Sequence, residues 1–367
     1  MEFYNFHPDK IKLINMIPFG RASSIFMQGL LDGHPEIVTI VFYYLRKEES
    51  GGKNFENIVN LNYQRIKERI NIYIGNYDLE KKIPKEKFAK YLKEYLNEFG
   101  ISHKTVFIGV HYAYAKHSKK DIKKVRYIFA HSHWPDVFLD LAESFPKQKM
   151  MFLIRDPRAS FLSGKRMKML LASVLYLRNV MDLYKKIRKK NKDIIAIKHE
   201  TLHVNYKKVK EVLIDWLDIK KHSSLDSATF LGKPFYGMDH PTVASPSGKS
   251  NIPSPKFVNE NWKNELSTAE INFVQFFFSD IIEIFAYEKI SKYEPLWVEY
   301  FFTRRNLSLN MIKNNYHGLR KISLKILRGM YMIPLIGRPM VKIVWIVKEV
   351  SEMIYENMKI KFRIRFM

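Results

Sequence analysis

A short polar turn near the N-terminus separates an apolar run from a helical pattern. Residues 16–37 read MIPFGRASSIFMQGLLDGHPEI, and between the predicted strand and the predicted helix stand Arg21, Ala22, Ser23 and Ser24. This arrangement directs backbone N–H groups and the positive end of the helix dipole to one point, which suits an anion. Arg21 adds a bidentate cation, and the serines add hydroxyl donors. The turn therefore predicts an anion site, although no Gly-Lys-Ser/Thr closes it as in a Walker A loop.

A second basic motif follows an apolar run in the middle of the chain, where residues 149–166 read KMMFLIRDPRASFLSGKR. A buried strand would deliver Arg155 at its carboxyl end, where open α/β sheets bind ligands. Asp156 and Pro157 suit the start of a helix. Ser163 lies two turns into that helix, so Arg155 and Ser163 can converge on one phosphate. The alternative is an Arg–Asp pair on the surface at a strand end, which this motif alone would favour.

Two further patterns contain paired histidines. His131 and His133 follow an apolar run, and at a strand end their side chains point to the same side. His199 and His203 match the zinc-protease pattern H-E-x-x-H literally. A zinc site needs both histidines on one helix face and a third ligand beyond. Because an apolar strand runs straight into this segment and no third histidine motif follows, zinc is a minor alternative here.

Continuous apolar runs alternate with amphipathic helical patterns over most of the chain. We predict strands at 10–18, 37–44, 105–112, 125–130, 149–154 and 193–198, and helices at 24–33, 134–145 and 207–219 among others. The alternation indicates an α/β fold with a parallel sheet covered by helices on both faces. Residues 232–261 lack periodicity and predict a long loop. A capping box at Ser267 and Glu270 then opens a helix predicted at 266–287.

The composition excludes several function classes. The 367 residues contain no cysteine, which excludes disulfides, thiolate metal sites, iron–sulfur clusters and a cysteine nucleophile. A hydrophobic share of 46% excludes a disordered chain. The net charge of +25 points to an anionic partner, although lysines favoured by A+T-rich codons would give the same charge without one. The basic clusters come with no nucleic-acid motif, so no specific nucleic acid is expected.

The C-terminal part of the chain differs from the rest in its pattern of charged and apolar residues. We predict an α/β domain over 1–290 and a basic, amphipathic, helical extension over 291–367. Residues 317–367 hold eleven Lys or Arg and three Glu, a net charge of +8, interleaved with apolar residues. Such a segment suits an anionic membrane surface, or it folds onto the domain as a basic helical pair. With no apolar run of about 18 residues and no secretory signal, we expect a cytoplasmic protein, soluble or peripheral to the membrane.

In order and spacing, these motifs resemble the family of sulfotransferases that use 3′-phosphoadenosine 5′-phosphosulfate. Residues 21–24 are similar to the family's 5′-phosphosulfate loop, usually Arg/Lys-Ser-Gly-Thr-Thr. Residues 154–158 with Ser163 are similar to its 3′-phosphate motif, and residues 196–202 to its Arg-Tyr-Glu-Asp-Leu segment. Lys256 and the stretch after it resemble the loop that closes over the 3′ end of the nucleotide. The resemblance covers roughly residues 10–287.

The resemblance implies a P-loop-like parallel sheet that binds 3′-phosphoadenosine 5′-phosphosulfate as the donor and uses no metal. The donor-binding residues that it implies are Arg21, Ala22, Ser23, Ser24, Arg155, Ser163 and Lys256. Two departures concern the 5′-phosphosulfate loop: Ser23 stands where the family usually has glycine, and Ile25 where a second hydroxyl is common. They affect side-chain contacts to the phosphate and leave the backbone contacts unchanged. At the 3′ loop only Lys256 is kept.

Sulfuryl transfer to a hydroxyl needs a base for the acceptor proton, an anion cradle for the leaving phosphate, and both oxygens in line with sulfur. Residues 127–138 resemble the family's Lys-Thr-His-Leu-Pro stretch, which places His133 at the base and His131 where a lysine stands. An unperturbed histidine pKa near 6.5 suits a base at neutral pH. The alternatives are that both histidines only orient the acceptor or cap the next helix, or that a carboxylate such as Glu36 is the base.

The sequence therefore predicts a sulfotransferase that moves a sulfuryl group to a hydroxyl of an unidentified acceptor. A glycan or a lipid-linked saccharide is favoured. The alternatives are a nucleotide-binding protein without sulfotransfer activity and, less favoured, a zinc hydrolase built on His199 and His203.

Overall fold

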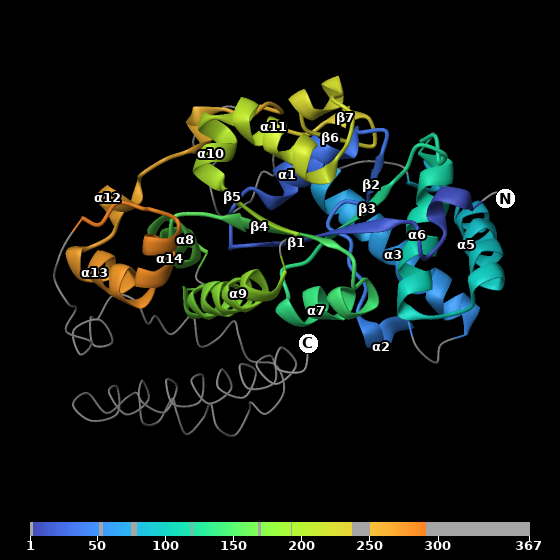
Figure 1. Cartoon of the computed structure of the whole chain (residues 1–367), viewed down its shortest axis with the longest axis horizontal. Coiled ribbons are helices and arrows are strands. Elements are labelled where there is room, and N and C mark those ends of the chain that lie inside the picture. The colour runs from blue at the N-terminus through green and yellow to red at the C-terminus, as the bar shows by residue number, and fades with distance from the viewer. Residues whose placement is uncertain are drawn as a thin grey trace, which may run out of the picture.

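Five parallel strands form a central sheet in the order β2-β3-β1-β4-β5. The computed structural model describes residues 3–50, 54–74, 79–118, 120–167, 170–191, 193–236 and 250–290. The strands of the sheet are β1 (Lys12–Pro18), β2 (Ile37–Thr39), β3 (Tyr127–His131), β4 (Lys149–Ile154) and β5 (Ile194–Lys198). Helices lie above and below the sheet (Figure 1). The predicted α/β fold class is confirmed.

Two groups of helices cover the two faces of the sheet, and two further groups lie at its two ends (Figure 1). On one face lie α1 (Ser24–Asp32), α10 (His199–Val204) and α11 (Tyr206–Leu217), and on the other α7 (Pro135–Ser144) and α9 (Leu170–Lys190) (Figure 1). One end carries α2 (Lys47–Ser50), α3 (Phe55–Ile74), α4 (Leu79–Lys82), α5 (Lys85–Phe99) and α6 (His103–His117). The other end carries α8 (Pro157–Arg166), α12 (Trp262–Glu265), α13 (Thr268–Phe277) and α14 (Ser279–Ile284). The described residues also form short elements: η1 (Tyr4–Phe6), η2 (Ser223–Asp226), η3 (Pro255–Phe257) and the hairpin β6 (Thr229–Phe230) with β7 (Lys233–Pro234).

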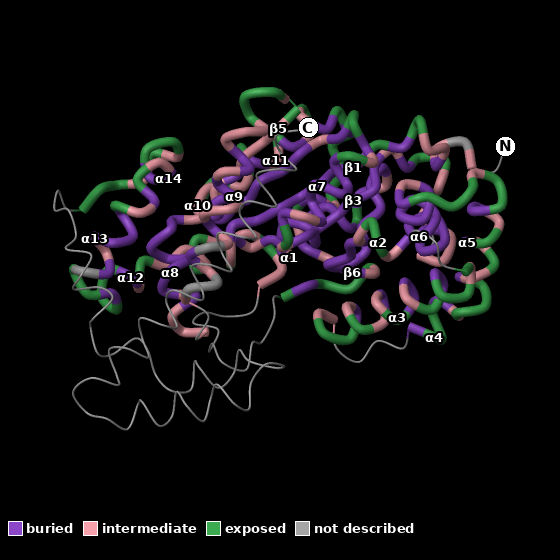
Figure 2. Tube along the Cα trace, turned by 90° about the horizontal axis from the view of Figure 1, so that it is seen from below, coloured by how far each residue is buried: buried purple, intermediate pink, exposed green. Residues whose placement is uncertain are grey.

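The apolar character of β1 explains its place at the centre of the sheet. Every residue of the strand after Lys12 is buried, because β1 is paired on both edges and covered on both faces. Figure 2 shows the buried residues concentrated along the strands and the exposed ones at the periphery. A core of this kind holds the carboxyl ends of β1, β3 and β4 together at one edge of the sheet.

One predicted strand is wrong: residues 105–112 form part of helix α6. Ser102 caps this helix, since its side chain accepts from the Thr105 N–H while the Thr105 hydroxyl accepts from the Ser102 N–H. The helix is buried on nearly all sides, so its sequence shows no alternation of apolar and polar faces. A short apolar run rich in β-branched residues then looks like a buried strand.

The strand predicted at 37–44 is too long, because β2 ends at Thr39. The side chain of Gln28 on α1 donates to the Ile40 carbonyl at 2.8 Å and accepts from the Phe42 N–H at 3.0 Å. It therefore takes up backbone groups that a longer strand would have paired. Phe42 also has a positive φ of 49°, which bends the chain out of the strand.

The other predicted strands and helices agree with the structure to within a few residues. The predicted loop at 232–261 contains the short elements β7 and η3, and its residues 237–249 lie outside the described residues. The predicted helix at 266–287 is capped by Ser267 and Glu270 as expected, but it breaks at Phe278 into α13 and α14. Residues 291–367, with the basic segment 317–367, lie outside the described residues, and the domain boundary at 290 stays a prediction. In the part of the chain that the structure describes, no helix has the length and apolar character needed to cross a membrane.

Candidate functional site

The polar turn after β1 leads into a helix whose first N–H groups have no side-chain cap. Phe19 donates to the Leu153 carbonyl of β4 at 2.7 Å, which fixes the point where the chain leaves the sheet. Arg21 and Ser23 then adopt positive φ values of 63° and 59°. Ser23 precedes α1, but its side chain makes no capping hydrogen bond to the helix. The first-turn N–H groups of this nine-residue helix therefore lack the side-chain acceptor that usually caps them.

Arg155 connects the two motifs that the sequence singled out. It follows β4 directly, and its Nη1 donates to the carbonyl oxygen of Arg21 at 2.9 Å. Its Nε is buried and has no hydrogen-bond partner in the described part of the chain. Burial, and then the nearby Arg21 guanidinium, lower the pKa of Arg155 against the opposing effect of Glu200. A guanidinium with an unused buried donor beside an open helix N-terminus is suited to a bound anion.

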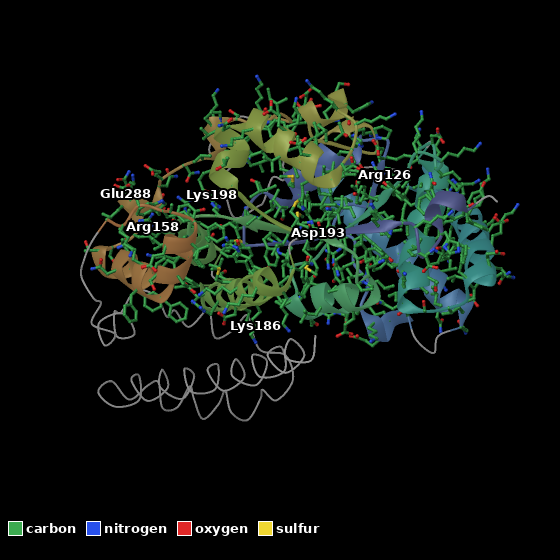
Figure 3. The ribbon with its side chains drawn as sticks, viewed as in Figure 1. Arg126, Arg158, Lys186, Asp193, Lys198 and Glu288 are labelled. Carbon is green, nitrogen blue, oxygen red and sulfur yellow. The ribbon has the colours of Figure 1, made fainter. Side chains whose placement is uncertain are left out.

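The neighbouring Arg158 has a structural role instead. It is almost fully buried, forms a bidentate pair with Asp156 and donates to the carbonyl of Glu288 at 2.7 Å. Its guanidinium also lies 4.0 Å from the centre of the Trp262 ring. Figure 3 shows Arg158 and Glu288 close together at the end of the sheet where β4 terminates. Arg158 thus ties the start of α8 to the C-terminal helices, while half-buried Ser163 lies in the second turn of α8.

The hydroxyl of Ser23 is bound by two histidines of α10. Ser23 Oγ lies 3.0 Å from His199 Nδ1 and 3.0 Å from His203 Nε2. His199 Nε2 lies 3.2 Å from the Phe257 carbonyl, which can only accept, so His199 carries its proton on Nε2. Its Nδ1 must then accept from Ser23, and His203 Nε2 must donate to Ser23. This assignment leaves His203 Nδ1 as a buried acceptor without a donor.

This network differs from the roles predicted for its members. The sequence predicts that Ser23 donates to a bound phosphate, whereas in the structure its hydroxyl donates to His199 Nδ1. Both histidines have pKa values lowered first by burial and next by Arg155, to about 2 for His199 and about 4 for His203, so both are neutral at pH 7. The hydrogen-bond partner that His199 and His203 share is the Ser23 hydroxyl. Among the described residues, no group of three His, Cys, Asp or Glu could hold a metal ion. Lys256 is exposed on η3, next to Phe257.

We expect Ser23→Ala to lower the free energy of unfolding by about 1–3 kcal/mol, because two buried ring nitrogens lose their partner. Ser23→Gly should be about 1 kcal/mol less destabilising than Ser23→Ala, since glycine adopts a positive φ without strain. Urea unfolding measures both values. Ser118→Ala, which removes one hydroxyl bond at the end of α6, is the control. Wild-type stability in Ser23→Ala would contradict the network.

His133 lies near the polar turn, just beyond the end of β3. Its ring stacks against Tyr176 at 6.1 Å with an angle of 16° between the planes, and the Tyr176 hydroxyl donates to the Pro18 carbonyl at the start of the turn. In the described structure its ring makes no hydrogen bond. Burial, then Arg21 and Arg69, lower the pKa of His133 to about 4. The imidazole is therefore neutral at pH 7 and able to accept a proton.

His131 is buried next to His133. It is fully buried, and its Nδ1 lies 3.2 Å from the side-chain oxygen of Gln28, the residue that holds the loop at Phe42. Its ring centre is 5.0 Å from that of His133 and 4.6 Å from that of Phe42. His131 thus packs behind His133.

Glu36 lies at the opposite edge of the sheet. It immediately precedes β2, whereas the polar turn follows the carboxyl end of β1. Its carboxylate accepts from Arg126 at 3.0 Å and from the Lys220 N–H at 2.9 Å. Figure 3 places Arg126 and Arg158 at opposite ends of the sheet. Glu36 is therefore too far from the turn to act as the base.

Sequence reasoning missed two members of the site. Arg69 of α3 lies over the rings of Phe42 and Tyr44 and is close enough to lower the pKa of His133. Tyr176 of α9 connects His133 to the start of the turn. Neither belongs to a recognisable motif. The only available signal was the spacing of Arg65, Arg69 and Tyr73, which places three polar side chains on one face of a helix.

No family model matches the chain, and no curated protein matches it either. Three similar solved structures are sulfotransferases. A sulfotransferase domain of the olefin synthase of Synechococcus PCC 7002 is 18% identical with a TM-score of 0.43, and 76% of this chain covers 96% of that one. A sulfotransferase domain of the curacin biosynthetic pathway is 16% identical with a TM-score of 0.47, over 76% and 99% of the two chains. A sulfotransferase of Mycobacterium avium is 11% identical with a TM-score of 0.40, over 78% of each chain.

Proposed function

We propose that this chain is a sulfotransferase that takes a sulfuryl group from 3′-phosphoadenosine 5′-phosphosulfate and passes it to a hydroxyl of a saccharide acceptor. The observation that carries the proposal is the 2.9 Å contact from Arg155 Nη1 to the Arg21 carbonyl. It brings the motif assigned to the 3′-phosphate against the motif assigned to the 5′-phosphosulfate. One nucleotide with anionic groups at both positions would fit two adjacent cation sites of this kind.

The electrostatics around the turn support the same proposal. In the described structure, the side chains of Arg21 and Arg69 make neither an ion pair nor a hydrogen bond, and Arg155 keeps a buried donor unused. Uncompensated guanidinium groups in a partly buried setting destabilise the free protein and are favourable once an anion binds. A donor with several negative charges supplies that compensation.

In the proposed reaction His133 accepts the proton of the acceptor hydroxyl as the hydroxyl oxygen bonds to sulfur. The bond between sulfur and the 5′-phosphate oxygen breaks, and the electron pair stays on that phosphate. The N–H groups at the start of α1 and the guanidinium of Arg21 stabilise the charge that develops there. The products are the sulfated acceptor and adenosine 3′,5′-bisphosphate, and the proton leaves from His133 to solvent.

A thermal-shift experiment tests the donor assignment. Adenosine 3′,5′-bisphosphate at saturating concentration should raise the melting temperature clearly more than adenosine monophosphate, because only the former fills both cation sites. Transfer of labelled sulfate from the donor to saccharide acceptors then distinguishes a sulfotransferase from a nucleotide-binding protein without activity. Equal shifts with the two nucleotides would reject the assignment.

A further inference from the structure

Four aromatic rings form a cluster beside His133, on the side of α3. The ring cluster consists of Phe42, Tyr44, Tyr73 and Trp134. Phe42 is central to it, with ring centres 5.6 Å from Tyr73, 6.2 Å from Tyr44 and 6.4 Å from Trp134. The Phe42 ring is also 5.0 Å from that of His133, so the cluster borders the proposed base directly. Trp134 is 37% exposed and Tyr73 is half-buried, so part of the cluster is open to a ligand.

Three arginines contact the ring cluster, and two of them are neutralised. Arg65 forms a bidentate pair with Glu49, at 2.6 and 2.9 Å. Arg46 lies over Trp134 and is paired with Asp136 at 2.7 Å. Arg69 lies 4.8 Å from the centre of the Phe42 ring and has no acidic partner and no hydrogen bond in the described structure. Its Nε is buried without a partner. Arg69 is therefore the cation of this cluster that still needs an anion.

Arg69 comes from a different element than the groups assigned to the donor, although burial raises the pKa of the Tyr73 hydroxyl and Arg69 and Arg21 are both close enough to oppose that rise. Arg155 and the turn with Arg21 already provide for the two anionic positions of the nucleotide. Arg69 comes from a different helix and contacts the rings rather than the turn. His133 is close to both Arg21 and Arg69. The acceptor hydroxyl must lie against both the donor sulfur and His133. Because Arg21 holds the donor on one side of His133, a cation on the ring side of His133 faces the acceptor.

We propose that Arg69 binds an anionic group of the acceptor, so that the acceptor is an acidic saccharide whose ring packs on the exposed aromatic side chains. The inference rests on the proposed function and names its substrate class. A carboxylate matches the planar fork of a guanidinium, and the apolar face of a sugar ring matches Trp134 and Tyr73. The large positive net charge would also steer an acidic saccharide to the protein.

The test compares two probes that differ only at C6 of the sugar, 4-nitrophenyl β-D-glucuronide with a carboxylate and 4-nitrophenyl β-D-glucoside with a neutral hydroxymethyl group. Their dissociation constants are measured by ligand-detected NMR titration of the full chain without the donor. We expect the glucuronide to bind about tenfold or more tightly, and added salt to reduce the difference. Arg69→Gln should abolish the preference. Arg69→Lys should keep part of it, which shows that a loss in Arg69→Gln comes from the charge rather than from misfolding.

Lys67→Gln is the matched control, because it removes the same charge from α3 at a position outside the ring cluster that is already paired with Glu80. It should keep the glucuronide preference. Equal binding of both probes by the wild type, or an unchanged preference in Arg69→Gln, would overturn the inference. A loss of adenosine 3′,5′-bisphosphate affinity in Arg69→Gln with the glucuronide preference intact would also overturn it, since Arg69 would then serve the donor. Failure of the proposed function itself is seen separately, as equal thermal shifts with the two nucleotides.

Discussion

Alanine in place of Arg155 is expected to remove most of the preference of the protein for adenosine 3′,5′-bisphosphate over adenosine monophosphate. The 3′-phosphate would lose a charge-assisted hydrogen-bond donor in a partly buried position, which costs about 1.5–3 kcal/mol or roughly 10- to 150-fold in affinity. Affinity for adenosine monophosphate should change much less, because that ligand lacks the 3′-phosphate. Titration calorimetry of both nucleotides at one ionic strength measures the ratio.

The contact from Arg155 to the Arg21 carbonyl makes a control necessary, since its loss could disturb the turn itself. Arg155→Lys keeps the charge without the fork and should retain part of the preference. Arg166→Ala removes an arginine of α8 that is paired with Glu265, and it should leave the ratio unchanged. A ratio that survives in Arg155→Ala would show that the 3′-phosphate binds elsewhere.

Replacement of His133 by alanine should lower the turnover number by roughly two to four orders of magnitude, the usual contribution of a positioned general base. Donor binding should persist, because the turn after β1 and Arg155 hold the nucleotide without His133. The measurement is transfer of labelled sulfate to 4-nitrophenyl β-D-glucuronide, with nucleotide affinity followed in parallel. His222→Ala, an exposed histidine bonded to Ser224, is the control. Full turnover in His133→Ala would assign the base to another group.

The pH dependence follows from the surroundings of His133. A base works in its neutral form, so activity is present above its pKa and falls as the pH drops through it. In the free enzyme burial, then Arg21 and Arg69, hold this pKa at about 4. A bound anionic donor offsets the two guanidinium charges and raises the pKa toward its ordinary value. The acid limb of kcat should therefore lie at higher pH than the acid limb of kcat/KM for the donor, which reports the free enzyme. Coincident limbs would contradict this account.

The strands of the sheet could be predicted because they are continuously apolar: β1, β3 and β4 are buried along nearly their whole length, and the edge strand β5 is half-buried. The same rule failed for α6. Val106, Ile108 and Val110 have high strand propensity, and a helix buried on nearly all sides shows no periodic polar face. What identifies the helix is the capping box at Ser102, where Thr105 stands in place of the usual Glu or Gln. The capping residues thus identify residues 103–117 as a helix, which the hydrophobic pattern alone does not distinguish from a strand.

The site could be predicted only where it follows local rules. The turn at residues 21–24 and the position of Arg155 follow from strand ends and helix starts, which are local. The partner of the Ser23 hydroxyl is 176 residues away in the chain, and nothing near Ser23 indicates it. The role of Arg69 cannot be predicted from its neighbours in the sequence either. It depends on the fact that no acidic side chain of the described residues pairs with Arg69 in the folded structure. Charge compensation is a property of the folded structure.

The strand order also has a consequence for how the molecule folds during synthesis. The central strand β1 is made first, but its two neighbours, β3 and β4, are made more than a hundred residues later. At ordinary elongation rates the ribosome needs about 5 to 25 seconds to supply them. Until then an almost wholly apolar strand has no partner, which exposes the nascent chain to aggregation. The turn after β1 waits longer still, because His199, which binds the Ser23 hydroxyl, and Phe257, which orients His199, are made after both strands.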